Sequence, residues 1–374
     1  MIMYLIYESK LLSYRFREPH PMKPERYLLT YELIKSYGLI DARISVVKPK
    51  LFEEKILLLA HDEEYVDFVK SMSKLGEGYL DYGDTPAFKG CFEAALLHVS
   101  STLTAVDIAF NRGIVSVNLA GGYHHAKRLS AGGFCIFNDI AIAVNYLADK
   151  YGVRRIAVVD FDVHHGDGTQ ELLYDKDVLK IDIHEDGRYL YPGTGFVSEL
   201  GEGDGYGYMV NIPMPPHSSD DDYILVFEEV IIPLLKWYKP EFLLCQCGVD
   251  AHYTDPLAHM ELTSKAYKYM SKRLSEISSL YCKNKCVLLG GGGYNLSSVP
   301  RMWLVIMSSF LNLELSDKLP RNWIELFREI MGLEGPRSLY DKLEAREIPS
   351  VKRSVREVVT KVKETLREIH GPVI

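Results

Sequence analysis

Short apolar runs alternate along the chain with longer segments in which apolar residues recur every three or four positions. The short runs are rich in Val, Ile and Leu and predict strands buried on both faces, whereas the longer segments predict helices. The predicted strands span residues 4–7, 114–118, 155–161, 178–183, 209–212, 242–247 and 286–289. The predicted helices span residues 24–37, 63–73, 90–112, 138–151, 220–237, 263–281 and 297–311.

This alternation of strand and helix is typical of a parallel sheet with helices on both faces, so we expect the α/β class. No internal repeat or linker divides the chain, and we expect a single domain over residues 1–374. Residues 315–374 are expected to form a C-terminal helical extension. Its last helix carries one apolar stripe, which predicts packing on the same chain rather than a subunit interface. The stripe consists of Val351, Val355, Val358, Val359, Val362, Leu366 and Ile369.

Composition and charge narrow the possible classes of function. Of 374 residues, 47% are hydrophobic and 25% charged, as in ordinary globular proteins. The formal net charge of −8 disfavours direct binding to nucleic acid. We find no signal peptide and no apolar run near the roughly 18 residues of a membrane span, so we expect a cytoplasmic protein without a membrane partner.

Six cysteines in a chain of this length do not predict a disulfide framework. Cys245, Cys247, Cys282 and Cys286 can be combined into a structural zinc site. We favour buried free thiols, because neither pair has the CxxC spacing of such sites.

The segment 154–170, RRIAVVDFDVHHGDGTQ, begins as a buried strand and ends in a cluster of ionisable residues. Ligands of an open parallel sheet bind beyond the carboxyl ends of its strands, where this cluster lies. If the extended path continues past the strand, Asp160, Asp162 and His164 point to one side and form part of a metal site. Asp250, just past another predicted strand, is the best candidate for a further ligand. A capped loop and a patch of solvated charge are the alternatives.

A second cluster, NLAGGYHHAKRLSAGGFCIFND, places His124 and His125 between two pairs of glycines. The glycine pairs indicate a close approach of the backbone to another group. Asp160 and Asp167 can each orient one imidazole, as carboxylates do for catalytic histidines. Without such partners, two surface histidines in a turn would be the simpler interpretation.

A third cluster, VLLGGGGYNLSS, consists of a predicted strand, four glycines and Tyr294 at the start of a helix. A phosphate-binding loop is one interpretation, but neither a GK[ST] nor a GxGxxG pattern is present. A flexible glycine hinge that presents the tyrosine hydroxyl fits equally well.

With these clusters side by side, the chain resembles the histone deacetylase superfamily of zinc-dependent enzymes. The resemblance covers residues 4 to 312 and rests on the ordered motifs HPMKPERYLLTYELIKSYGL, DTPA, GGYHHAK, GGFCIFND, VVDFDVHHGDGTQE, YPGTG, CGVDAHYTDPL and LGGGGYNL. The AGGYHHA form is similar to the class I branch and to the acetoin-utilisation-type proteins of bacteria and archaea. The fold that this implies is one domain with an eight-stranded parallel sheet and helices on both faces.

The resemblance also implies metal ions. Zinc would be held by Asp162, His164 and Asp250, with a water molecule in the open position. Fe(II) is an alternative, because one imidazole and two carboxylates suit several metals. A structural or regulatory potassium ion is implied as well, with ligands from Asp160, Asp162, His164, Asp182 and Ile183.

Catalytic roles follow from the same resemblance. His125, paired with Asp167, would be the main general base and acid, and His124, paired with Asp160, its electrostatic partner. Tyr294 would stabilise the tetrahedral oxyanion. The implied substrate contacts are Gly133, Phe134, Tyr191 and Leu257 along a tunnel, Asp84 at its rim and Arg26 near an inner pocket that receives acetate.

The implied reaction is hydrolysis of an acetylated amine, most directly the ε-N-acetyl group of lysine in proteins, by a metal-bound water. An acetylpolyamine or another small acyl-amine is the alternative substrate, and Tyr191 in place of the Phe of class I enzymes bears on that choice. A ureohydrolase with two manganese ions would need a carboxylate where Gly166 stands. A catalytically silent acetyl-lysine binder would not retain all these residues. The sequence leaves the oligomeric state open.

Overall fold

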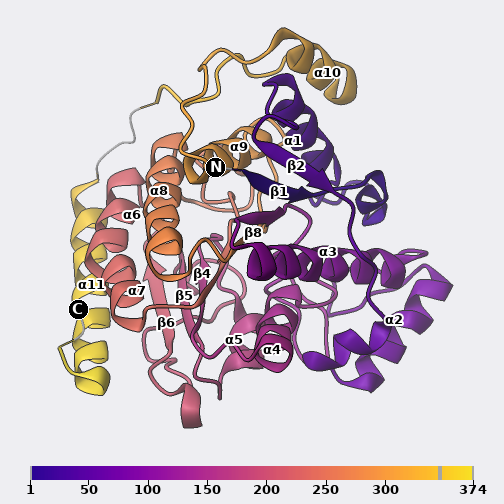
Figure 1. The fold of residues 1–374 in the computed structure, drawn as a ribbon. Helices are drawn as coiled ribbons and strands as arrows, with labels where there is room; N and C mark the ends of the chain where they lie inside the picture. Colours follow the sequence, from indigo (N-terminus) through magenta and orange to yellow (C-terminus); the bar gives the residue numbers. More distant parts are fainter. Residues whose placement is uncertain (1, 344–347, 373–374) are drawn as a thin grey trace.

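The apolar runs form one sheet of eight strands, each parallel to its neighbours (Figure 1). The computed structural model describes residues 2–343 and 348–372. The strands are β1 (Met3–Ile6), β2 (Ile44–Val47), β3 (Ser116–Asn118), β4 (Ile156–Asp160), β5 (Leu179–Glu185), β6 (Met209–Met214), β7 (Phe242–Gln246) and β8 (Cys286–Leu289). Their order in the sheet is β2-β1-β3-β8-β7-β4-β5-β6. The predicted α/β class with an eight-stranded parallel sheet is therefore confirmed.

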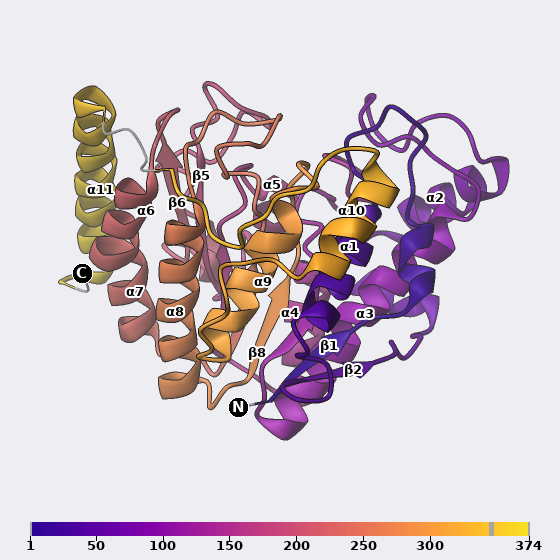
Figure 2. The same cartoon turned by 90° about the horizontal axis from the view of Figure 1, so that it is seen from above.

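Helices cover both faces of this sheet (Figure 2). The helices are α1 (Glu25–Ser36), α2 (Glu63–Leu75), α3 (Cys91–Arg112), α4 (Asp139–Tyr151), α5 (Asp167–Leu173), α6 (Asp220–Val226), α7 (Ile232–Tyr238), α8 (Ser264–Tyr281), α9 (Val299–Phe310), α10 (Arg321–Met331) and α11 (Pro349–His370). Helices α2 to α5 contribute to the core on one face, and α1 and α6 to α11 contribute to the core on the other.

The central strands send alternate side chains into these two cores. In β4, Ala157 and Val159 belong to one core, whereas Ile156 and Val158 belong to the other. Side chains alternate along a strand, so a sheet covered on both faces needs apolar residues at nearly every position. This explains why the strands were readable as continuous apolar runs.

Three elements differ from the sequence prediction. The sequence did not predict β2, a four-residue edge strand in which only Ile44 is buried. It also did not predict α5, which begins at Asp167, the last acidic residue of the ionisable cluster. The helix expected over residues 220–237 is interrupted by a π-turn at Phe227–Ile231. Pro233 lies in the first turn of the following helix and has no N–H to donate, which favours this interruption.

Helix α3 runs through the interior beside the sheet. Among the described residues it is the one helix long and apolar enough to cross a membrane by length and composition, which the sequence analysis did not find. However, 78% of its apolar window is buried inside the protein. In this structure α3 is a core helix.

The C-terminal segment lies against the rest of the chain. The indole N–H of Trp323 in α10 donates to the carbonyl of Leu29, with a distance of 2.8 Å. Helix α11 lies beside β6 and α6, and the apolar stripe predicted for it includes four buried residues, Val355, Val359, Val362 and Leu366. The delimitation of one domain over residues 1–374, with an extension from residue 315, stays a prediction.

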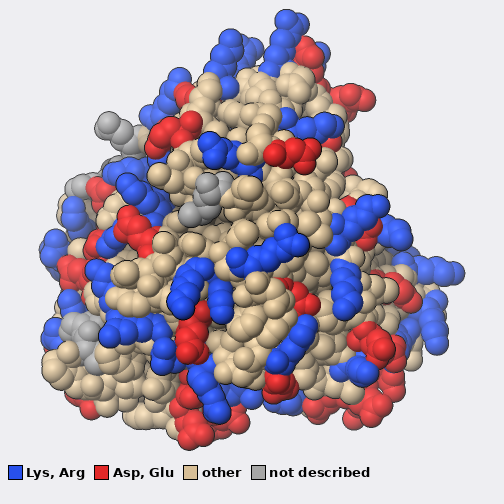
Figure 3. All heavy atoms as spheres, in the orientation of Figure 1, with Lys and Arg blue, Asp and Glu red and all other residues tan. Residues whose placement is uncertain are grey.

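On the face shown in Figure 3, Lys and Arg side chains are interspersed with Asp and Glu, and no broad surface of one sign forms. A mixed surface of this kind lacks the continuous basic stripe with which proteins follow a phosphate backbone. It agrees with the net charge of −8.

Two buried histidines are held as neutral rings. His61 accepts a hydrogen bond from the N–H of Asn138 and donates one to the carbonyl of Lys127. His98 faces the hydroxyl of Tyr123 and donates to a backbone carbonyl. Burial lowers the pKa of both histidines to about 4, from 6.5 in the unfolded chain.

We therefore expect the contribution of these two rings to the free energy of unfolding to fall as the pH drops from about 6.5 to about 4, because the unfolded chain binds protons that the folded rings do not. Each ring contributes about 3 kcal/mol over this window. Urea unfolding of EDTA-treated protein at several pH values measures the slope. His61→Gln should lose about 3 kcal/mol less than the wild type over this window, since glutamine can donate and accept without titrating, and His217→Gln on the surface is the matched control. The same pH dependence in the wild type and in His61→Gln would contradict the account.

Candidate metal centre and active site

The carboxyl ends of β4 and β7 meet in the middle of the sheet. After β4 the chain continues to β5 on one side, and after β7 it continues to β8 on the other. The two connections diverge at this point, which is where a parallel sheet opens a crevice for ligands. The predicted ionisable residues follow these two strands.

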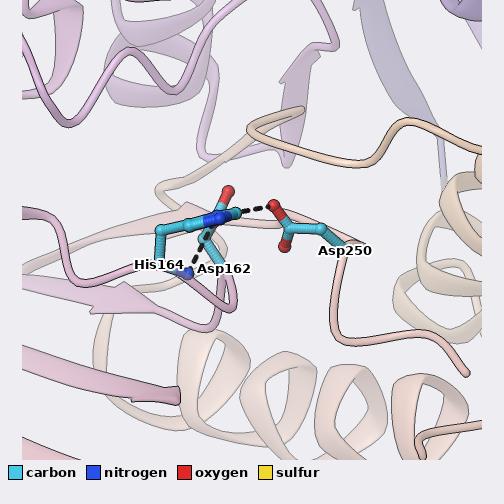
Figure 4. Close-up of side chains that lie close together, drawn as sticks. All are labelled: Asp162, His164 and Asp250. Atoms are coloured by element: carbon cyan, nitrogen blue, oxygen red, sulfur yellow. Dashed lines mark hydrogen bonds and ion pairs between the residues drawn. The ribbon is translucent and has the colours of Figure 1, made fainter. Parts of the chain in front are cut away.

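Three of them come together in this crevice (Figure 4). Nδ1 of His164 lies 3.2 Å from Oδ1 of Asp162 and 3.1 Å from Oδ2 of Asp250. All three side chains are buried, and within residues 2–343 and 348–372 they are the one set of His, Cys, Asp or Glu residues grouped closely enough to hold a metal ion. One imidazole nitrogen and two carboxylate oxygens form a donor set that suits a divalent ion such as zinc.

The electrostatics of this group favour a bound cation. Burial and the charge of Asp162 raise the pKa of Asp250 to about 7. Although burial alone would lower it, the two carboxylates raise the pKa of His164 to about 10. Two buried carboxylates this close repel each other unless positive charge lies between them. The residues present therefore fit a metal ion.

Backbone and amide donors hold the carboxylates in place through the oxygens that point away from His164. Oδ2 of Asp162 accepts hydrogen bonds from Nε2 of Gln246 at 2.8 Å and from the N–H of Gly292 at 2.7 Å. Oδ1 of Asp250 accepts one from the N–H of Val163 at 2.9 Å. One oxygen of each carboxylate is thereby left to face the imidazole.

The glycine run is what allows this close approach. A Cβ atom on Gly292 would lie 2.0 Å from Oδ2 of Asp250, and one on Gly248 would lie 2.1 Å from Oδ2 of Asp162. Gly291 has a φ of +69°, which other residues rarely adopt. The Gly292 N–H donates to Asp162, one of the three residues Asp162, His164 and Asp250 that we call the metal group. In this structure the run packs against the carboxylates of Asp162 and Asp250, a role that neither the phosphate-loop nor the hinge interpretation anticipated.

The two adjacent histidines lie beside this group, each with its own carboxylate. Nδ1 of His124 is 2.9 Å from Oδ2 of Asp160, and Nδ1 of His125 is 2.7 Å from Oδ1 of Asp167. The other oxygen of Asp167 is 2.9 Å from Nζ of Lys127. The pairs expected from the sequence are therefore present. Burial, followed by the neighbouring His124, lowers the pKa of His125.

Asp160 departs from the path expected for it. The strand ends at Asp160, so the alternation of side chains does not continue to residues 162 and 164. Asp160 turns to His124 and is absent from the metal group. The Cα of Gly166 lies against this pair, because a Cβ there would be 2.8 Å from Oδ2 of Asp160 and 3.0 Å from Nδ1 of His124. A carboxylate at residue 166, as a second metal ion would require, would displace the pair.

One narrow cavity adjoins the metal group and the histidines. Of the residues predicted for the site, it is lined by Arg26, His124, His125, Gly133, Phe134, Asp162 and Tyr294. Its remaining lining residues are Met22, Gly121, Gly122, Tyr123, Cys135, Gly291 and Gly292. The three sequence clusters thus converge on one concave surface.

Arg26 and Tyr294 enter this cavity from separate elements. The Arg26 side chain is buried, donates from Nη1 to the carbonyl of Gly293 and from Nη2 to the hydroxyl of Tyr27, and leaves Nε without a partner. The N–H of Tyr294 donates to Oδ2 of Asp255 at 2.7 Å. The phenol ring of Tyr294 meets the ring of Phe134 edge-on, with 5.6 Å between centroids.

The remaining predicted substrate residues lie outside the lining of this cavity. Tyr191 is 44% exposed and places its ring 5.0 Å from that of His125. Asp84 lines a surface groove that shares Phe134 with the cavity, and burial followed by Asp81 raises its pKa to about 6. The N–H of Leu257 donates to Oδ1 of Asp255, and the other oxygen of this carboxylate accepts the N–H of Tyr294.

Sequence reasoning missed two residues that position the site. Gln246 ends β7 and bridges Asp162 to the loop before His124. Asp139, in the first turn of α4, accepts the N–H groups of Gly122 and Tyr123. A polar residue inside an apolar run, as in LLCQC, was the available signal for Gln246.

The C-terminal segment also reaches the site. Asp341 lies 3.0 Å from Nε2 of His252, two residues after Asp250, and 3.0 Å from Nη1 of Arg301. His252 is also 2.9 Å from the hydroxyl of Thr254, in the loop that leads to Asp255. A residue outside the predicted family motifs thus supports the loop that carries Asp250.

Comparisons with known proteins point to one family. Residues 20–310 match the histone deacetylase domain family. The chain is 38% identical over 346 residues to the acetoin utilization protein AcuC of Bacillus subtilis (strain 168), covering 90% of this chain and 89% of that protein. It is 35% identical over 349 residues to AcuC of Staphylococcus aureus (strain MRSA252), with the same coverage.

A solved structure shares the whole architecture. The crystal structure of the HDA15 HD domain superposes with a TM-score of 0.83 at 26% identity, covering 100% of this chain and 96% of that one. The family match, the AcuC relatives and the buried Asp–His–Asp group indicate a metal-dependent hydrolase that removes acetyl groups. The chain therefore belongs to the histone deacetylase family, in its acetoin-utilisation branch.

Proposed function

We propose that this deacetylase hydrolyses the ε-N-acetyl group of lysine in proteins, with zinc at Asp162, His164 and Asp250, and releases acetate and the free amine. The observation that supports this most strongly is the convergence of the metal group and two carboxylate-backed histidines on one narrow cavity. Zinc in this position would supply a Lewis acid that polarises the amide carbonyl and acidifies water.

His125 is the proposed general base and acid. Asp167 holds Nδ1 of His125 at 2.7 Å, so Nε2 is the atom that takes the proton from the attacking water and returns it to the leaving amine. His124, paired with Asp160, is the proposed electrostatic partner that stabilises charge beside it.

Tyr294 is proposed to donate its hydroxyl hydrogen bond to the developing oxyanion. Desolvation and the negative charges of Asp250 and Asp162 raise the pKa of Tyr294 well above its usual value, so the phenol keeps its proton. A donor that lies ready in the cavity before the charge develops stabilises the transition state more than the substrate.

The remaining predicted residues are proposed to bind the substrate. Gly133 and Phe134 would line the path of the lysine methylenes, with Tyr191 and Leu257 nearer its entrance, and Asp84 would accept the substrate backbone N–H at the rim. The unpartnered Nε of Arg26 is a donor suited to the carboxylate of acetate.

We place the enzyme in the cytoplasm, because all six cysteines are buried free thiols, as suits a reducing compartment. Cys245, Cys247, Cys282 and Cys286 form no group of metal-site spacing among the described residues. Zinc is therefore assigned to the Asp–His–Asp group alone.

The zinc-loaded chain should deacetylate a fluorogenic acetyl-lysine peptide. His125→Ala should lower kcat by about 10²- to 10⁴-fold, and Tyr294→Phe by about 10²- to 10³-fold. His217→Ala, at an exposed histidine, is the matched control, and circular dichroism checks the fold of each variant. Faster turnover of acetylspermidine than of acetylated proteins would show that the substrate is a small acetylated amine. Absence of turnover with any acetylated amine would refute the proposal.

Asp167→Asn should shift the acid limb of the kcat/KM profile to lower pH, by about one unit. The reason is that the Asp167 carboxylate raises the pKa of His125, and its removal lets burial and His124 lower that pKa further. Lys127→Met is the matched control, because loss of the cation beside Asp167 should move the limb the other way. An acid limb at the same pH in all three proteins would show that His125 is not the base.

Gly292→Ala should weaken zinc binding by about ten- to a hundredfold, since the new Cβ would lie 2.0 Å from Oδ2 of Asp250. Competition with a chromophoric chelator measures the affinity. Gly38→Ala, where no atom lies within 4 Å of the new Cβ, controls for the loss of a glycine. Equal affinity in all three proteins would contradict the assigned ligand set.

A further inference from the structure

A lysine is buried in β5, the strand next to the one that ends at Asp160. Lys180 is in β5, only 1% of its side chain is exposed, and its Nζ is 2.5 Å from Oδ2 of Asp182. Lysine is rarely found fully buried in a protein, and then almost always with a charge partner. Its neighbours in β5, Leu179 and Ile181, belong to the apolar core of the opposite face.

Asp182 lies between this lysine and the catalytic pair. In the register of the sheet, Asp182 is directly opposite Asp160 of β4. A Cβ atom added to Gly166 would lie 2.8 Å from Oδ2 of Asp160, 3.0 Å from Nδ1 of His124 and 3.2 Å from Oδ2 of Asp182. The oxygen that Lys180 contacts therefore belongs to the same small cluster of atoms as the Asp160–His124 pair.

Both oxygens of Asp182 are already engaged. Oδ2 accepts hydrogen bonds from Nζ of Lys180 and from the N–H of Gly166, and Oδ1 is 2.6 Å from Nδ1 of His184. Asp182 is one of the ligands predicted for a potassium ion. A potassium ion at Asp182 would have to displace a covalently attached cation or lie close to it, and like charges repel strongly in a buried site. The side chains present do not fit the predicted ion.

We infer that the ammonium group of Lys180 is the built-in counter-charge for Asp182 and Asp160 and takes the place of a potassium ion in this enzyme. Lys180 is thus a positioning residue: it holds Asp182, which lies opposite the Asp160 carboxylate that pairs with His124, and it is absent from the lining of the cavity. The enzyme is accordingly independent of potassium.

The melting temperature of the zinc-loaded full chain tests this inference without reference to activity. Choline chloride is replaced stepwise by potassium chloride at constant total salt, so that screening stays the same. The melting temperature of the wild type should change by no more than about 1 °C, because the cation position is already filled. A saturable rise with potassium that sodium does not reproduce would overturn the inference.

Substitution of Lys180 should make the melting temperature depend on potassium. Lys180→Met should melt at lower temperature in choline chloride, and potassium should raise its melting temperature where sodium and choline do not. Lys180→Met/Asp182→Asn removes both charges, so it should recover stability relative to Lys180→Met and lose the potassium response. Lys236→Met, on the exposed side of α7, is the matched control. A Lys180→Met variant that matches the wild type in choline chloride would overturn the inference.

Kinetic measurements separate a positioning role of Lys180 from a purely stabilising one. Of the tests described for Lys180, only this one rests on the role proposed for His124. Lys180→Met should lower kcat by about tenfold in choline chloride with KM unchanged, and potassium should restore kcat. A rise in KM with unchanged kcat would refute the positioning role while leaving the proposed deacetylation intact. If Lys180→Met does not fold in any salt, the potassium response of the wild type decides by itself.

Discussion

The need to neutralise buried carboxylates at one edge of the sheet is the constraint on which the rest of the structure depends. Five such carboxylates are buried at the centre of the fold: Asp160 ends β4, Asp182 lies opposite it within β5, and Asp162, Asp167 and Asp250 follow β4 or β7. A buried carboxylate is costly unless a cation or several donors face it. Each therefore faces an imidazole or an ammonium group, and these partners include the groups that we propose to carry out the reaction.

The partners divide the cluster into parts with separate roles. Asp162 and Asp250 face His164 and are the pair that a metal ion would neutralise. Asp167 is shared by His125 and Lys127, whereas Asp182 faces Lys180 and His184. Glycines at the strand ends allow backbone N–H groups to reach the oxygens that remain, as Gly292 does for Asp162. In this arrangement the residues that neutralise buried charge in the fold are the same ones that we propose for catalysis.

Much of this could be predicted from the sequence, because the apolar runs mark the strands and the informative residues lie directly after them. The resemblance to a known family then separated Asp162 from Asp160, which alternation along an extended strand could not do. The alternation does not reach Asp162, because β4 ends at Asp160 and the chain turns there. The partners of Asp182 were not predictable either. Lys180 and Asp182 share a face at i and i+2, but only the strand order of the folded sheet places Asp160 opposite Asp182.

The central claim is that one metal ion, held by Asp162, His164 and Asp250, is the catalytic centre. Anomalous diffraction at the zinc edge from crystals of the zinc-loaded chain tests it most directly. We predict a single peak per chain between these three side chains, absent from crystals of an inactive His164→Ala variant. Two peaks per chain, or one peak at another position, would contradict the account.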